Sequence, residues 1–151
     1  MLSNYDIEDI CKKLKLPLVG VFSKDRMPDR HYIGSYYINM QNYDDGDGTH
    51  WVYARIFPNG QALYFDSYGF KSPVEIETFL KGFKPYATNN RQIQSLKSEN
   101  CGLYCIACDY FFTYDADKNK SIVDNYSDFI NMWSADPIKN DKILKEYLNK
   151  G

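Results

Sequence analysis

The 151-residue chain, with 44% hydrophobic and 25% charged residues, has the length and composition of one globular domain over residues 1–151, which excludes a disordered tail and a coiled coil. Its net charge of −2 argues against an electrostatic attraction to nucleic acid. The opening residues lack the basic and apolar regions of a signal peptide, and no apolar stretch approaches the roughly 18 residues of a membrane span, so we expect no membrane association.

The first part of the chain alternates between helical and extended patterns. Ser3 and Asp6 form a capping pair, and apolar residues recur after them at helical spacing, which predicts a helix. Residues 18–22 and 32–40 each predict a strand, because aromatic and β-branched side chains dominate them. The polar, glycine-containing residues 41–48 predict a surface loop. The apolar face of the helix consists of Ile7, Ile10, Cys11 and Leu14.

The clearest hairpin of the chain joins a strand at 50–57 to a strand at 61–66. Its loop, residues 58–60, reads Pro-Asn-Gly, which suits a type I turn followed by glycine in the left-handed conformation. A three-residue loop places Phe57 opposite Gln61, and this pairing sets the register of the whole hairpin.

The hairpin register brings one of the two histidines near a carboxylate. Counting back from the turn puts Val52 opposite Asp66, so His50 shares a face with Asp66 at an offset of roughly 7 Å, which side chains can bridge. Asp66 is equally well explained as a turn former at the end of its strand. The other histidine, His31, lies in a polar stretch and is expected to be exposed.

The second half of the chain is mainly helical. Ser72 as N-cap, Pro73 and Glu75 predict a helix, residues 90–94 a short strand, and residues 101–113, which are apolar on nearly all sides, a buried helix. Two C-terminal helices follow, and the second opens with Asp136 as its cap and Pro137 after it.

This order of elements predicts an α+β fold with a small mixed sheet flanked by helices. Four cysteines would permit two disulfides, but Cys101, Cys105 and Cys108 lie too close together to join distant segments. We therefore expect reduced thiols and an intracellular setting.

Cys101 combines two features of a nucleophile. It opens the predicted buried helix, where the helix dipole stabilises a thiolate, and Gly102 after it would let a substrate backbone approach closely. Cys105 and Cys108 lie deeper in the same helix and are expected to be small apolar fillers.

A metal site is the rival interpretation of the three cysteines. Their spacing matches the iron–sulfur ligands of radical enzymes that use S-adenosylmethionine. Those enzymes need a large β/α barrel and carry the motif in a loop near their start, whereas this motif is late, apolar and helical. We therefore expect no metal and no cofactor.

Three segments together resemble the adenovirus endopeptidase (adenain) family. They are residues 48–51 (GTHW), 65–70 (FDSYGF) and 94–102 (QSLKSENCG), and a first helix followed by residues 19–25 also fits. The resemblance runs from the first helix through the buried helix, in the chain order His, acid, Gln, Cys. It implies the cysteine protease fold that this family shares with SUMO-specific proteases.

The resemblance also implies a role for each site residue. His50 would be the general base, Asp66 the residue that orients it, and Cys101 the nucleophile. Gln94 would form an oxyanion hole with the Cys101 backbone N–H, which agrees with what acyl transfer needs. Gln92 is the competitor of Gln94, and only the spacing to Cys101 favours Gln94.

Two further residues would contact substrate. Trp51 is either a core residue or a wall of the substrate cleft, and the resemblance favours the cleft; Gly102 would lie beside the substrate backbone. The chain departs from the adenovirus enzymes in having Asp66 where they have Glu, as the wider clan often does. It is also shorter and acidic, and residues 67–93 lack the cysteine that would bind a disulfide-linked peptide.

These features lead to one expected function and two alternatives. We expect a monomeric cysteine endopeptidase that cleaves capsid or minor virion proteins at Gly-containing sites, in the virion and the host cytoplasm, for a virophage or related element. We expect it to need neither DNA nor an activating peptide. The alternatives are an isopeptidase acting on host ubiquitin-like conjugates and a non-enzymatic binding module.

Overall fold

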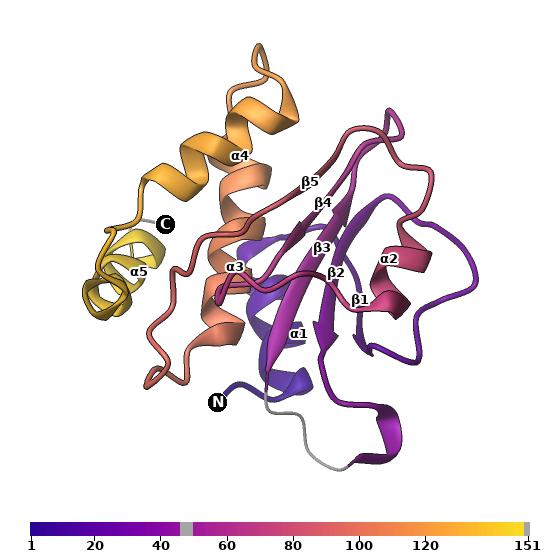
Figure 1. Cartoon of the computed structure of the whole chain (residues 1–151), viewed down its shortest axis with the longest axis horizontal. Coiled ribbons are helices and arrows are strands. Elements are labelled where there is room, and N and C mark those ends of the chain that lie inside the picture. Colours follow the sequence, from indigo (N-terminus) through magenta and orange to yellow (C-terminus); the bar gives the residue numbers. More distant parts are fainter. Residues whose placement is uncertain (46–49, 150–151) are drawn as a thin grey trace.

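A five-stranded mixed sheet, in the order β1-β2-β3-β4-β5, forms the centre of the computed structural model, which describes residues 1–45 and 50–149 (Figure 1). Strands β2, β3 and β4 are antiparallel, whereas β1 pairs with β2, and β5 with β4, in parallel. The predicted α+β class with a small mixed sheet is confirmed. The strands are β1 (Leu18–Ser23), β2 (Gly34–Asn39), β3 (Trp51–Ile56), β4 (Ala62–Phe65) and β5 (Tyr86–Thr88).

Helices cover both faces of the sheet, because the strands bury alternate residues on opposite sides. Tyr37, Tyr53 and Phe65 face the larger core under α1, α3, α4 and α5, whereas Tyr36 and Tyr64 face a smaller core under α2 (Figure 1). Within the described ranges no helix has the length and apolar character needed to cross a membrane. The helices are α1 (Asn4–Leu14), α2 (Val74–Phe79), α3 (Cys101–Tyr110), α4 (Ile122–Asn131) and α5 (Asn140–Leu148).

The first helix has the predicted cap. Ser3 Oγ accepts a hydrogen bond from Asp6 N at 3.1 Å, and Ser3 N donates to Asp6 Oδ2 at 2.8 Å. These bonds satisfy donors that a helix start leaves without partners. Ile7 and Cys11 on the predicted apolar face are buried in the larger core.

The hairpin also has the predicted register. Strand β3 pairs with β4 so that Tyr53 faces Phe65 and Ile56 faces Ala62. The loop is closed by Phe57 N donating to Gln61 O at 2.8 Å, and Gly60 has a φ of 80°, the left-handed conformation that glycine adopts without strain.

Two predicted strands require correction. The strand predicted at 32–40 begins only at Gly34, because Tyr36 OH bonds both N and O of Tyr32 and holds that residue in a loop. The strand predicted at 90–94 is wrong, since β5 lies earlier, at Tyr86–Thr88. The backbone N–H groups near position 93 bond the carbonyl of a turn rather than a strand.

Four smaller predictions also differ from the structure. Ser72 is not the cap of α2, because its hydroxyl donates to Glu77 instead, and Pro73 takes the N-cap position. The helix predicted at 101–113 ends at Tyr110 and continues as a π-helical turn, Phe111–Asp115. Of the loop predicted at 41–48, Tyr43–Asp45 form a short 3₁₀ helix, and residues 46–48 lie outside the described residues. Asp136 caps a 3₁₀ turn, Pro137–Lys139, before α5.

A buried carboxylate joins α3 to the sheet. Asp109 accepts hydrogen bonds from Ser35 Oγ at 2.6 Å and from Tyr37 OH and Tyr53 OH at 2.7 Å each, and Arg55 lies at 3.3 Å. Burial raises the pKa of Asp109, while these hydroxyl groups and the guanidinium oppose that shift. The carboxylate is therefore stable inside the protein only while its donors are in place.

We predict that Asp109→Ala lowers the free energy of unfolding by about 3–5 kcal/mol, because it leaves Arg55 as an unpaired, largely buried charge. Urea denaturation followed by circular dichroism measures the change. Asp128→Ala is the matched control, since Asp128 pairs with Lys120 at the surface and its loss costs little. Equal effects of the two substitutions would show that the buried bonds of Asp109 do not stabilise the packing of α3 on the sheet.

Candidate active site

His50 and Asp66 meet beyond the paired ends of β3 and β4. His50 directly precedes β3 and Asp66 directly follows β4, so the hairpin register places both on one face. His50 Nε2 donates to Asp66 Oδ1 at 2.8 Å. The side chain of His50 is 15% exposed and that of Asp66 1%, so this pair is largely shielded from water.

Asp66 is fixed by groups other than the histidine. Its Oδ1 also accepts from Tyr68 N at 2.8 Å. Asn89 holds the Asp66 main chain on both sides, because its Oδ1 accepts from Asp66 N at 3.1 Å and its Nδ2 donates to Asp66 O at 2.7 Å. Tyr126 OH in turn donates to Asn89 Oδ1 at 3.1 Å. These bonds fix the main chain and the carboxylate of Asp66 in the position from which it accepts the hydrogen bond of His50.

Tyr68 covers the imidazole. Its ring stacks on that of His50 with centroids 4.6 Å apart and planes 23° from parallel. Neither Tyr68 nor Asn89 is a site residue that the sequence predicts. Tyr68 could have been suspected from the sequence because it lies two positions after Asp66. Asn89 could not, because it lies 23 residues from Asp66, the residue it bonds.

Cys101 is the first residue of α3, as the sequence predicts. The backbone N–H of Trp51, next to His50, donates to Cys101 Sγ at 3.4 Å, and Cys105 Sγ donates to Trp51 O at 3.5 Å. Cys101 is 2% exposed and lies at the positive end of a ten-residue helix. Both the N–H group and the helix dipole stabilise negative charge on this sulfur.

The imidazole of His50 interacts with both Asp66 and Cys101, and these interactions favour its protonated form. Its Nε2 is used by Asp66 and its Nδ1 is buried, so Nδ1 is the nitrogen left for Cys101. Burial has the largest effect on the pKa of His50 and lowers it, but hydrogen bonds and charges of Asp66 and Cys101 together raise it to about 9. The imidazolium is therefore the favoured form at neutral pH.

Gln94 is buried beside the turn that follows Asp66, whereas Gln92 is exposed. Gln94 is 0% exposed; its Oε1 accepts from Ser67 Oγ at 2.5 Å and its Nε2 donates to Ser98 O at 2.8 Å. Gln92 is exposed and donates to the Gln94 backbone carbonyl at 2.9 Å. The buried, oriented amide is the arrangement that an oxyanion donor needs.

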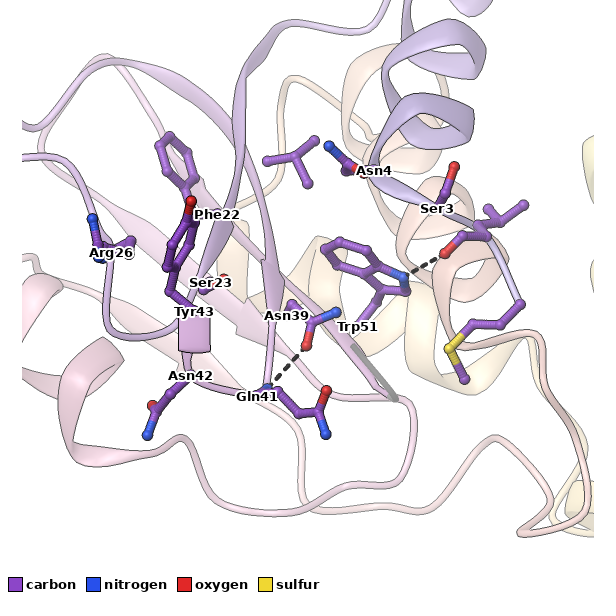
Figure 2. A pocket seen from close by; sticks show the side chains of 13 residues that line it. Ser3, Asn4, Phe22, Ser23, Arg26, Asn39, Gln41, Asn42, Tyr43 and Trp51 are labelled. Carbon is purple, nitrogen blue, oxygen red and sulfur yellow. Dashed lines mark hydrogen bonds between the residues drawn. The ribbon is translucent and has the colours of Figure 1, made fainter. Parts of the chain in front are cut away.

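A groove of about 900 Å³ adjoins the site at Trp51 (Figure 2). Its walls come from the start of the chain and from the ends of β1 and β2, with Ser23 and Asn39 among the polar residues. Trp51 Nε1 donates to Leu2 O at 2.9 Å. A Cβ on Gly102 would meet Leu2 Cδ1 at 3.0 Å, so close packing of Leu2 is one reason for glycine there.

The other cysteines have different surroundings from Cys101. Burial raises the pKa of Cys11 to about 12 and the pKa values of Cys105 and Cys108 well above the ordinary range. All four thiols are free, and the described part of the chain contains no group of three His, Cys, Asp or Glu side chains placed to hold a metal. His31 is exposed, as predicted, and lies against α2.

Comparisons with known proteins show the fold. No family model matches the chain, and no curated protein matches it. Among solved structures, the ASFV pS273R protease matches with a TM-score of 0.56 and 16% identity, over 89% of this chain and 63% of that one. This chain thus spans less than two thirds of that protease.

The match shows the class of fold, not an activity. The chain has the fold of a viral cysteine protease of the ubiquitin-like protease type, and the predicted fold class is therefore confirmed. Membership of the adenain family and the site roles remain predictions.

We predict that Asp66→Asn lowers the pKa of His50 by about one unit or more, because an amide keeps the hydrogen bond but removes the charge. Titration of the two histidine side chains by NMR measures it, with His31→Gln to assign the second signal. The raised pKa also means that the proton on His50 stabilises the native state below pH 6.5, and that this contribution is lost as the pH rises through about 9. An unchanged pKa in Asp66→Asn would contradict the pairing.

Proposed function

We propose that the protein is a cysteine endopeptidase with Cys101 as nucleophile, His50 as base and Asp66 as the residue that orients His50. The observation that carries this proposal is the position of His50, bonded to Asp66 at 2.8 Å through Nε2 while Nδ1 is left for the thiol. The fold shared with a viral protease supports it.

The proposed reaction follows from these positions. The Cys101 thiolate attacks the carbonyl carbon of the scissile bond, and His50 gives its proton to the departing amine, which leaves a thioester on Cys101. Water then attacks the thioester with His50 as the base. The first N–H of α3, at Cys101, and the amide of Gln94 would bind the oxyanion in both steps.

We propose that the groove beside Trp51 binds the substrate chain (Figure 2). Trp51 both lines the groove and donates its N–H to Cys101 Sγ, so a chain bound there leads to the nucleophile. Gly102 would lie beside the bound backbone. The resemblance to adenain supports, as substrates, capsid or minor virion proteins with Gly-containing sites, and as location, the virion and host cytoplasm.

The proposed enzyme works as a monomer and needs neither DNA nor an activating peptide. Its net charge of −2 supports independence from DNA, because phosphate contacts require a basic surface. Burial raises the pKa of Cys11, on the apolar face of α1, to about 12, which disfavours the thiolate that forming a peptide disulfide requires.

An isopeptidase for ubiquitin-like conjugates is the second candidate. The fold favours it as much as an endopeptidase, since ubiquitin-like proteases share this architecture. Comparing cleavage of a Gly-containing peptide with that of a ubiquitin-like fusion separates the two candidates. A binding module, the third possibility, would leave both substrates intact.

We predict that Cys101→Ala abolishes turnover, with a loss of about four decades or more in rate, while the fold remains intact. The assay uses a Gly-containing peptide under reducing conditions without DNA, and circular dichroism checks the fold. Cys108→Ala is the matched control, because Cys108 lies buried two turns further along α3. Full activity of Cys101→Ala, together with a loss in Cys108→Ala, would overturn the assignment.

We predict that Gln94→Ala lowers kcat by roughly 10²–10³ with little change in KM, the usual effect of losing one oxyanion donor. Gln92→Ala should change kcat far less, because its side chain is exposed and bonds only the main chain of its neighbour. Steady-state kinetics of both variants provides the comparison. Similar losses in both variants would refute the role of Gln94.

A further inference from the structure

The turn that follows the acid also holds the segment of Gln94. The carbonyl of Ser67 accepts hydrogen bonds from Ile93 N at 2.8 Å and from Gln94 N at 2.9 Å. Ser67 and Gln94 are both 0% exposed, so water does not compete for these bonds. The main chain of Gln94 is thus fixed to the residue directly after Asp66.

Ser67 contacts the side chain of Gln94 as well. Its hydroxyl donates to Gln94 Oε1 at 2.5 Å, and Gln94 Nε2 donates to Ser98 O at 2.8 Å. If the amide turned over, its oxygen would face the Ser98 carbonyl, which cannot donate. The two partners therefore select one orientation of the amide, in which one Nε2–H is donated to Ser98, and the second is the one that the proposed oxyanion hole would use.

We propose that Ser67 is a positioning residue that orients the Gln94 amide for the oxyanion, an inference that rests on the proposed protease function. Without the hydroxyl, Gln94 Oε1 would be a buried acceptor without a donor, and the amide would rotate away from its working position. Because Ser67 is next to Asp66, one turn sets both the residue that orients the base and the group that binds the oxyanion.

The first test is kinetic. We expect Ser67→Ala to lower kcat about 10-fold to 30-fold, with KM within threefold of wild type and an unchanged pH profile, since His50 and Asp66 are untouched. Ser67→Thr, which restores a hydroxyl, should recover most of kcat. Ser72→Ala is the matched control, because Ser72 is also a buried serine but its hydroxyl bonds Glu77 near α2.

A double-substitution cycle separates positioning from general stability. In a Gln94→Ala background, Ser67→Ala should cause no further loss of kcat, because its effect passes through the missing amide. A full additional loss there, or wild-type kcat in Ser67→Ala alone, would overturn the proposal. If the wild type cleaves the substrate and Cys101→Ala does not, the proposed protease function holds whatever the result for Ser67.

A second readout needs no activity. The side-chain amide protons of Gln94, assigned in NMR spectra with Gln94→Ala, should exchange slowly with water in the wild type. Ser67→Ala should accelerate their exchange at least tenfold, whereas Ser72→Ala should not. Equal exchange in wild type and Ser67→Ala would contradict the proposal even if no substrate is cleaved.

Discussion

The candidate site depends on the register in which β3 pairs with β4. The three-residue loop closed between Phe57 and Gln61 puts His50 and Asp66 on one face, at a distance their side chains bridge. A shift of one residue would send Asp66 to the opposite face of the sheet, because side chains alternate along a strand. Asn89 and Gln94 bond Asp66 and Ser67 in the turn that follows β4, so these contacts would be lost as well.

The position of Cys101 depends in turn on how α3 packs against β3. In its first two turns the helix contacts both main-chain groups of Trp51, through Cys101 and Cys105. Near its other end Asp109 bonds hydroxyl groups of the sheet, Tyr37 among them. A helix held to the sheet at both ends keeps the Cys101 thiol at a set distance from β3, the strand that follows His50. The arrangement of Asp66, His50 and Cys101 is therefore a consequence of how the helix and the hairpin pack.

Local signals account for what the sequence alone predicts. The cap at Ser3 and the Pro-Asn-Gly loop act within a few residues, so the first helix and the hairpin register could be predicted. What the sequence misses has two causes. The hydroxyl of Ser72 has a competing acceptor in Glu77, five residues on, so it bonds that side chain and not the helix start. Asn89 is a partner of Asp66, 23 residues away, only because β5 runs beside β4. In the sequence only the spacing to Cys101 separates Gln94 from Gln92, whereas in the structure burial and the bond from Ser67 distinguish them.

The most direct measurement of the central claim, that His50 activates Cys101, is the rate of alkylation by iodoacetamide at pH 6, with the modified residue identified by mass spectrometry. Wild-type protein should be modified first at Cys101, since the pKa values of the other three thiols are raised, whereas Cys101 lies at the start of α3 beside the Trp51 N–H. His50→Ala should slow this reaction at least tenfold, because the imidazolium no longer stabilises the thiolate. Equal rates in the two proteins, or earlier modification of another cysteine, would contradict the claim.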